Sequence, residues 1–136
     1  MTGLRYLLDT NILSTLLKHP AGPVANRIRS AGEATVCTSI VVACELRFGA
    51  AKKGSSTLSL RIGQLLDALE VLPLDDDVDK KYGELRAALE KQGTPIGAND
   101  YLIAAHALSQ GLTLVTDNVA EFSRVSGLAV ENWLRS

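Results

Sequence analysis

Short apolar runs alternate along this chain with segments whose apolar residues recur at helical spacing. Runs of this length are typical of buried β-strands, and we expect strands at Leu4–Leu8, Thr35–Thr38, Glu70–Leu74, Leu112–Thr116 and Leu128–Val130. Between two of these runs, Leu58, Ile62 and Leu65 fall on one face of a helix. Strands that alternate with helices form a mostly parallel sheet covered by helices on both faces. The pattern therefore predicts an α/β fold.

The chain has 136 residues, which is enough for one hydrophobic core and too few for two comfortable ones. Its composition, 46% hydrophobic and 21% charged, is that of a globular protein. We find no internal repeat or linker and expect one domain over residues 1–136. No apolar run approaches the roughly 20 residues that cross a bilayer. The early Asp9 does not fit a secretion signal, so we expect a soluble cytoplasmic protein that does not associate with a membrane.

The charge balance limits how this chain could hold nucleic acid. Its formal net charge is −1 and its pI is about 6.1. Proteins that bind nucleic acid mainly by neutralising phosphates usually carry a basic excess. A nucleic-acid substrate would therefore be held locally, by bound metal or by a few basic residues. Arg47, Lys52, Lys53 and Arg61 are candidates, although a solvated basic edge is the simpler explanation for them.

The two cysteines, Cys37 and Cys44, do not form a C-x-x-C pair, and both histidines lie far from them in the sequence. A structural zinc site needs four ligands at tighter spacings, so we expect two small buried thiols instead. His106 lies six residues after Asp100, which turns it roughly 240° around a helix. We therefore expect His106 on the surface.

Asp9 follows an apolar strand directly and precedes a segment of helical spacing. In a parallel α/β sheet, ligands collect outside the carboxyl ends of the strands, and Asp9 stands at such an end. An N-cap role for the following helix explains the same residue equally well. Both interpretations stay open for this position taken alone.

Glu45 interrupts an apolar helix face. In a helix that Ser39 caps, the neighbours of Glu45 one turn away include Val41 and Phe48. A buried charge without a partner is strongly unfavourable, so a compensating group is expected. An ion pair with a nearby arginine is one explanation, and a metal or catalytic role is the favoured one.

Three more polar residues stand at the ends of predicted elements. Asp100 opens a helix, where the macrodipole alone favours an acid. Asp117 and Asn118 follow an apolar strand, where turn chemistry also favours such residues. Each position by itself therefore has an ordinary structural explanation.

As a set, these positions indicate a metal site. If the first strand lies beside Leu112–Thr116, all of them converge on one crevice. Clustered carboxylates raise one another's pKa unless a cation neutralises them. Ligands that are all oxygen select hard cations such as Mg²⁺ or Mn²⁺ over zinc or copper. Such an ion activates a water molecule and polarises a phosphoryl oxygen in a displacement reaction.

Four segments resemble the signature blocks of PIN domains in their VapC-toxin form, namely LLDTNIL, VVACELRFGA, PIGANDYLIAAHAL and LVTDNVAEFSRV. They occur in the family's order, and the likeness covers essentially the whole chain. The resemblance implies a five-stranded parallel sheet in which the first strand neighbours Leu112–Thr116. It also implies a Mg²⁺- or Mn²⁺-dependent endoribonuclease that hydrolyses RNA with metal-activated water. Such a toxin is a homodimer, is silenced by a cognate antitoxin protein and meets DNA only through that antitoxin.

Carried over to this sequence, the family's three acids match Asp9, Glu45 and Asp100. The resemblance implies that Asp9 and Asp100 bind the metal directly. It implies that Glu45 binds metal through water or acts on the attacking water. At the fourth position the family has an acid or Asn, which matches Asn118 and leaves Asp117 one residue early. Asp117 would have to turn inward to contribute.

Thr10 and Thr116 flank these acids. They are candidates to orient a carboxylate or a water molecule, as groups behind metal ligands do. Helix capping and strand propensity explain the two threonines equally well.

Two other functions compete with a nuclease. The scaffold could act chiefly as a binding partner of a DNA-binding antitoxin, with little or no hydrolysis; the low pI and the uncharged Asn118 favour this. A phosphatase-like enzyme with Asp9 as nucleophile is disfavoured, because such enzymes usually carry a second acid where this chain has Asn11.

Overall fold

The computed structural model describes residues 3–75 and 77–134 and contains one five-stranded sheet whose strand pairs are all parallel. The strand order is β3-β2-β1-β4-β5. The strands are β1 (Tyr6–Leu8), β2 (Val36–Ser39), β3 (Glu70–Leu72), β4 (Thr113–Val115) and β5 (Val130–Glu131). Leu7 of β1 is paired with Cys37 on one side and with Leu114 on the other. The predicted α/β class is therefore confirmed, with the first strand beside the Leu112–Thr116 run.

Four of the strands are shorter than the apolar runs that predict them, β2 has the predicted length but starts one residue later, and the last strand is displaced toward the C-terminus. Gly127 has a positive φ of 82°, and the amide of Leu128 bonds back to the carbonyl of Val125. This turn uses residues that the apolar pattern assigns to the strand, so pairing with β4 begins only at Val130.

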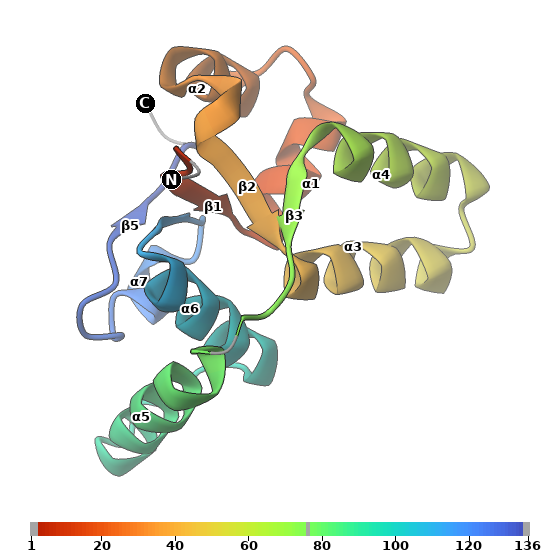
Figure 1. Cartoon of the computed structure of the whole chain (residues 1–136). Coiled ribbons are helices and arrows are strands. Elements are labelled where there is room, and N and C mark those ends of the chain that lie inside the picture. The colour runs from red at the N-terminus through yellow and green to blue at the C-terminus, as the bar shows by residue number, and fades with distance from the viewer. Residues whose placement is uncertain (1–2, 76, 135–136) are drawn as a thin grey trace.

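The helices connect the strands and lie on both faces of the sheet. They are α1 (Thr10–Lys18), α2 (Pro23–Ala31), α3 (Ile40–Lys53), α4 (Ser56–Ala68), α5 (Val78–Lys91), α6 (Ala98–Gln110) and α7 (Val119–Phe122), with a 3₁₀ turn at Glu33–Thr35. The order in which strands are added reverses after β3, and right-handed crossovers then place the later helices on the other face of the sheet. Figure 1 shows α6 and α7 on the opposite side of the strands from α2. Helix α5 packs mainly on α6 and extends away from the sheet.

The middle of helix α6 is mostly apolar and is buried at Tyr101 and at every residue from Ile103 to Ala107. The expectation of a surface His106 is wrong, because its side chain is fully buried. His106 does lie on the other side of α6 from Asp100, but that side faces the protein interior. There its Nδ1 lies 2.8 Å from Ser39 Oγ. Burial lowers the pKa of His106, although Asp75 and the Pro73 carbonyl favour the protonated form.

The two cysteines differ. Cys37 is buried in β2, and desolvation raises the pKa of its thiol to about 12. Cys44 is exposed, so the expectation of two buried thiols is wrong for it. It lies one turn from Phe48, whose side chain is 67% exposed, because this face of α3 turns outward. No helix in the described part of the chain has the length and apolar character of a membrane span.

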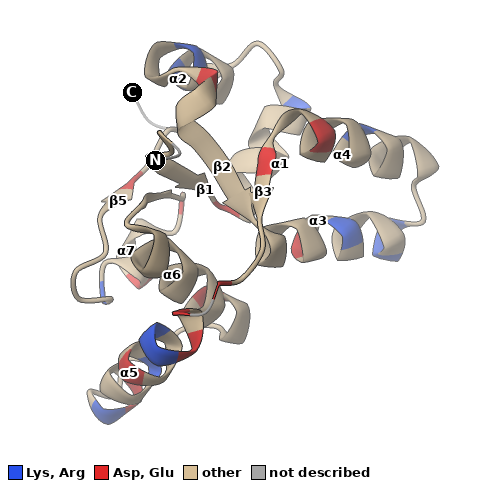
Figure 2. Cartoon of the chain, viewed as in Figure 1, with Lys and Arg blue, Asp and Glu red and all other residues tan. Residues whose placement is uncertain are grey.

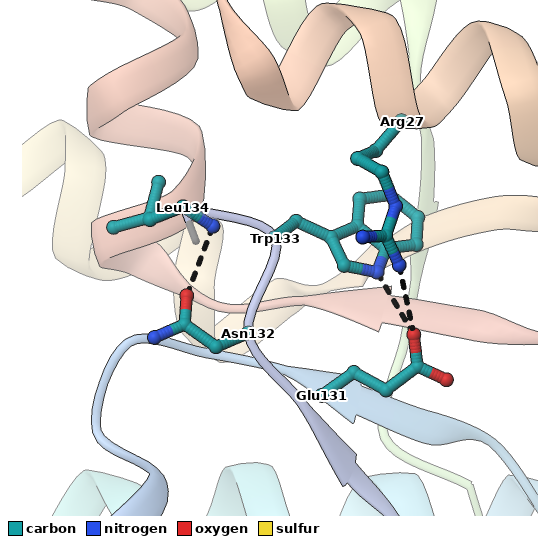
Figure 3. A network of polar contacts seen from close by, with 5 residues as sticks. All are labelled: Arg27, Glu131, Asn132, Trp133 and Leu134. Atoms are coloured by element: carbon teal, nitrogen blue, oxygen red, sulfur yellow. Dashed lines mark hydrogen bonds and ion pairs between the residues drawn. The ribbon is translucent and has the colours of Figure 1, made fainter. Parts of the chain in front are cut away.

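The last described residues are fastened to α2 and to β1. Trp133 is buried and meets Tyr6 edge to face at 5.0 Å between ring centroids. Its indole N–H donates to Glu131 Oε1, which also lies 3.4 Å from the Arg27 guanidinium (Figure 3). Asn132 accepts a hydrogen bond from the backbone amide of Leu134 in the same view. These contacts explain why the last described residues lie beside α2.

Ser39 connects the two helices that carry Glu45 and Asp100. Its hydroxyl caps α3 by accepting from the amide of Val41 at 3.1 Å and also contacts His106 of α6. We predict that Ser39→Ala lowers the free energy of unfolding by about 2–4 kcal/mol, because it removes a cap and leaves a buried imidazole nitrogen unpaired. Urea unfolding measures the change.

Ser55→Ala is the matched control for this prediction. Ser55 caps α4 by accepting from the amide of Leu58 at 3.1 Å, and among the described residues its hydroxyl has no second partner like His106. Its loss should be about 1 kcal/mol, the ordinary value for a helix cap. Equal losses in the two variants would show that the contact between Ser39 and His106 contributes nothing to stability.

Candidate active site

The carboxyl ends of β1 and β4 lie side by side, and the chain leaves them toward opposite edges of the sheet. Ligands bind at such a reversal point in open α/β sheets, because the outgoing connections separate and leave a crevice. A hollow of about 500 Å³ opens here. Its lining residues come from the residue after β1, from α1, α3 and α6, and from the segment after β4: Asp9, Thr10, Asn11, Ser14, Thr15, Lys18, Glu45, Asp100 and Asn118. Of the polar residues predicted to converge on one crevice, Asp9, Glu45, Asp100 and Asn118 do so and Asp117 does not.

Asp9 is buried at the base of this hollow, 4% exposed. Its Oδ1 accepts from the backbone amide of Thr10 and its Oδ2 from the hydroxyl of Thr116, both at 2.8 Å. Burial raises the pKa of Asp9, the nearby Glu45 and Glu121 raise it further, and the two hydrogen bonds oppose the shift. Asp9 is thus the N-cap of α1 and a wall of the hollow at the same time.

Glu45 reaches the hollow from the second turn of α3. Its Oε1 accepts a hydrogen bond from Thr10 Oγ1 at 2.5 Å, and its Oε2 accepts one from the side-chain amide of Asn99 at 3.4 Å. No arginine or lysine among the residues described in the structure forms an ion pair with it. The arginine explanation therefore fails, and the carboxylate is held by neutral donors at the edge of the hollow. Its apolar neighbour Phe48 is exposed, so this part of α3 is less buried than the sequence indicates.

Asp100 stands in the first turn of α6 and shares a hydrogen bond with Glu121 of α7. Desolvation raises the pKa of Asp100 to about 7, with Glu121, Asp9 and Glu45 adding to the shift. The pKa of Glu121 is lowered despite its own partial burial, because the Gly97 amide donates to it at 3.0 Å and the Asn118 side chain also donates to it. Of the two neighbouring acids, Asp100 is therefore the one whose pKa is raised and Glu121 the one whose pKa is lowered.

Glu121 is the acid that the sequence analysis missed. The signal was present, since Glu121 lies three residues after Asn118 and one helical turn brings such positions together. Without the fold, however, nothing indicates that the short helix α7 packs beside Asp100. Glu121 supplies a carboxylate next to Asn118, the uncharged residue that matches the fourth position of the family's site.

Asp117 does not complete the site. Its carboxylate accepts from the Asn132 side chain at 3.0 Å, and its amide donates to the Asn11 side chain at 3.0 Å. The residue is exposed and fastened to the C-terminal segment, so it does not turn inward. Asn118 does line the hollow.

The two flanking threonines have the orienting contacts that the sequence analysis raised as a candidate. Thr10 donates to Glu45 and Thr116 donates to Asp9. Thr116 also accepts from the backbone amide of Asn118 at 3.0 Å, which fixes the start of the turn after β4. Both hydroxyls therefore hold a carboxylate in place and tie two segments of the site together.

The donor set of the hollow fits a hard divalent cation. Three carboxyl groups and two side-chain amides line it, and the carboxyl group of Glu121 lies beside Asp100. None of these acids forms an ion pair with a lysine or arginine within residues 3–75 and 77–134. In the same part of the chain no three His, Cys, Asp or Glu side chains are grouped closely enough to hold one ion. That is compatible with Mg²⁺, which proteins usually bind through one or two carboxylates while water and substrate phosphates complete its shell.

Comparison with known proteins decides the family. Residues 6–128 match the PIN domain. The chain belongs to the PIN-domain family. It is 39% identical over 130 residues to the ribonuclease VapC2 of Rickettsia felis, covering 94% of this chain and 97% of that protein. It is 37% identical over 131 residues to the tRNA(fMet)-specific endonuclease VapC of Shigella flexneri, covering 96% and 98% respectively.

Solved structures give the same result for this PIN domain. The crystal structure of VapBC2 from Rickettsia felis bound to a promoter DNA fragment matches with a TM-score of 0.88 and 34% identity, covering 96% of this chain and 99% of that one. FitAcB from Neisseria gonorrhoeae matches with a TM-score of 0.83 and 30% identity, over 96% and 99% of the two chains.

The raised pKa of Asp100 gives a prediction about the metal-free protein. A carboxyl group whose pKa is higher folded than unfolded destabilises the fold where it is ionised, so its penalty is absent near pH 4 and complete above pH 7. Asp100→Asn should therefore raise the free energy of unfolding at pH 8 by about 1 kcal/mol, a value reduced for the solvent screening of a half-exposed group. Near pH 4 the gain should vanish.

Urea unfolding in EDTA at the two pH values measures this effect. Asp67→Asn, which changes an exposed acid on α4, is the control and should show no such pH dependence. A gain for Asp100→Asn that is the same at both pH values would contradict the electrostatic cause.

Proposed function

We propose that this PIN domain is a Mg²⁺- or Mn²⁺-dependent endoribonuclease and the toxin of a toxin–antitoxin pair. The observation that carries the proposal is that Asp9, Glu45 and Asp100 line one open hollow, with Glu121 beside Asp100, and that none of these acids forms an ion pair with a lysine or arginine among the described residues. The names of the relatives, ribonuclease VapC2 and a tRNA(fMet)-specific endonuclease, support the same chemistry. The substrate we propose is RNA, and the bond that is hydrolysed is a phosphodiester.

Asp9 and Asp100 are the residues proposed to hold the ion, because both carboxylates line the hollow from fixed backbone positions. When bound, the ion would lower the pKa of a water molecule and polarise a phosphoryl oxygen. Glu45 is proposed to accept the proton of the attacking water or to hold water on the ion. Thr10 and Thr116 keep Glu45 and Asp9 in position, and Asn118 and the Gly97 amide do the same for Glu121.

We propose a cognate antitoxin protein as the partner that silences this activity. Support comes from the solved neighbours, which include the DNA-bound VapBC of Salmonella typhimurium at 34% identity and FitAB bound to a DNA fragment at 30% identity. This chain is then proposed to form a homodimer that reaches DNA only through the antitoxin. The cytoplasm, where RNA and the antitoxin are made, is the proposed location.

The alternative of a binding module without hydrolysis has less support from the structure than from the sequence. It depended on the uncharged Asn118 and on the low pI. Glu121 places a carboxylate in contact with Asn118 and Asp100. The acidic character that metal chemistry needs is therefore present despite the neutral fourth position.

The central prediction is that Asp9→Asn lowers the rate of RNA cleavage by about 100-fold or more while the fold stays intact, because a proposed metal ligand loses its charge. The assay uses antitoxin-free protein, total cellular RNA and added Mn²⁺, with circular dichroism to verify folding. Asp117→Asn is the neighbouring control, since its carboxylate points to Asn132, and it should cut at nearly the wild-type rate. Cleavage by Asp9→Asn in a preparation free of other nucleases would overturn the proposal.

Glu121→Gln tests the acid that only the structure places in the site. We expect a rate about tenfold lower at fixed Mn²⁺ and a higher metal concentration for half-maximal activity, as for residues that support metal ligands. A titration of cleavage rate against Mn²⁺ measures both. An unchanged titration curve would mean that Glu121 only shapes the turn after β4.

A further inference from the structure

A second hollow, of about 250 Å³, adjoins the acidic one between α1, α3 and α4. The two share four lining residues, namely Thr10, Ser14, Lys18 and Glu45. They are therefore parts of one continuous depression that leads from the acids onto the outer part of α3. We call the second part the side groove.

The side groove carries positive charge where the first hollow carries negative charge. Lys18, Lys53 and Arg61 line it from three different helices, and Glu45 at the shared end is its one acid. Neither lysine forms an ion pair with any residue of the described ranges. The Arg61 guanidinium donates to the carbonyl of Leu17, which holds it against the wall of α1. In Figure 2 the basic positions of α3 lie beyond its acidic position, farther from the sheet.

This arrangement differs from the basic group that the sequence indicates. Arg47 lies against Gly63 of α4, and neither Arg47 nor Lys52 lines the side groove. Lys53 and Arg61 do line it, and Lys18 of α1 joins them. On a chain of net charge −1, these are cations gathered locally beside an acidic site.

The floor of the side groove is apolar. Leu46, Ala50 and Ile62 are almost fully buried beneath it, and no aromatic residue is part of its lining. Proteins that bind single strands by their bases use aromatic side chains as stacking surfaces, whereas backbone contacts use a positively charged track. The lining therefore suits phosphates and riboses, with little discrimination between bases.

We propose that the side groove binds the sugar-phosphate backbone of single-stranded RNA next to the bond that is cut. The inference rests on the proposed nuclease function and adds the substrate-binding surface to it. Lys18, at the junction of the two hollows, contacts the phosphate nearest the acids, and Lys53 and Arg61 contact the next ones along. The cations keep flanking phosphates beside a site whose own carboxylates repel them.

The first test removes the charges and measures the salt dependence of binding. In the Asp9→Asn background, which leaves RNA uncut, fluorescence anisotropy with a labelled single-stranded RNA gives the affinity at several salt concentrations. Each phosphate contact contributes about 0.7 to the slope of log affinity against log salt for single strands. Lys18→Gln with Lys53→Gln should reduce that slope by about 1.4. The control pair Lys80→Gln and Lys91→Gln, exposed on the outlying α5, should leave it unchanged.

The second test fills the groove without changing a charge. Gly49 lines the side groove, and a Cβ placed there meets nothing within 4 Å; the same space exists at Gly83 on α5. Gly49→Leu and Gly83→Leu both replace a helical glycine, so both should raise Tm by about 3 °C. Only Gly49→Leu should weaken RNA binding and lower kcat/KM, each by about tenfold.

The outcomes separate this inference from the proposed function. Suppose that the wild-type protein cuts RNA. The groove assignment is then overturned, and the nuclease function stands, if the Lys18 and Lys53 double variant has the same salt slope as the double variant on α5. The same conclusion follows if Gly49→Leu binds and cuts RNA as Gly83→Leu does. If these variants lose antitoxin binding and keep RNA binding, the groove is a protein-docking surface and the assignment is again overturned. If the wild type cuts no RNA, the proposed function fails, and the binding measurements still decide what the groove holds.

Discussion

Mutual repulsion among carboxyl groups is the constraint on which the rest of this structure depends. Asp9, Glu45, Asp100 and Glu121 come from four separate parts of the chain. Within the described residues none of them forms an ion pair with a lysine or arginine, although Arg124 acts on Glu121 and lowers its pKa. Three devices make this tolerable: hydroxyl donors at Thr10 and Thr116, backbone and amide donors to Glu121, and a pKa of about 7 that lets Asp100 hold a proton. A group of acids held in this way is suited to a divalent cation, which would replace the proton and remove the repulsion.

The scaffold holds these acids through contacts that lie behind them. Ser39 caps the helix that carries Glu45 and contacts His106 on the helix that carries Asp100, so the two helices are connected by a buried hydrogen bond. At the other side, Asp117 is fixed by Asn132 and Asn11, which holds the turn that presents Asn118. Asp117, a candidate active-site acid in the sequence, therefore has a structural role. It connects the C-terminal segment to the site.

The two ends of the depression carry opposite charge. This arrangement lets a protein whose net charge is slightly negative bind a polyanion. One end is acidic and suits a metal ion, and the other presents Lys18, Lys53 and Arg61 over an apolar floor. A phosphodiester chain lying across both ends would meet a cation at each, the ion at one end and the side chains at the other. Affinity would then come from a few local contacts, in agreement with the absence of a basic excess in the sequence.

The sequence by itself determined the α/β class and the order of strands and helices. The convergence of Asp9, Glu45, Asp100 and Asn118 followed from it only with the strand neighbours that the resemblance to PIN domains implies. Apolar periodicity is a local property and predicts which segments are strands and which are helices. Residues at the carboxyl ends of neighbouring strands come together because parallel strands end at one edge of the sheet. The tertiary structure decided the rest: that His106 is buried, that Cys44 is exposed, that Asp117 points away, and that Glu121 joins the site. Each of these depends on which element packs against which, and a side chain's partners across the fold leave no periodic mark in the sequence.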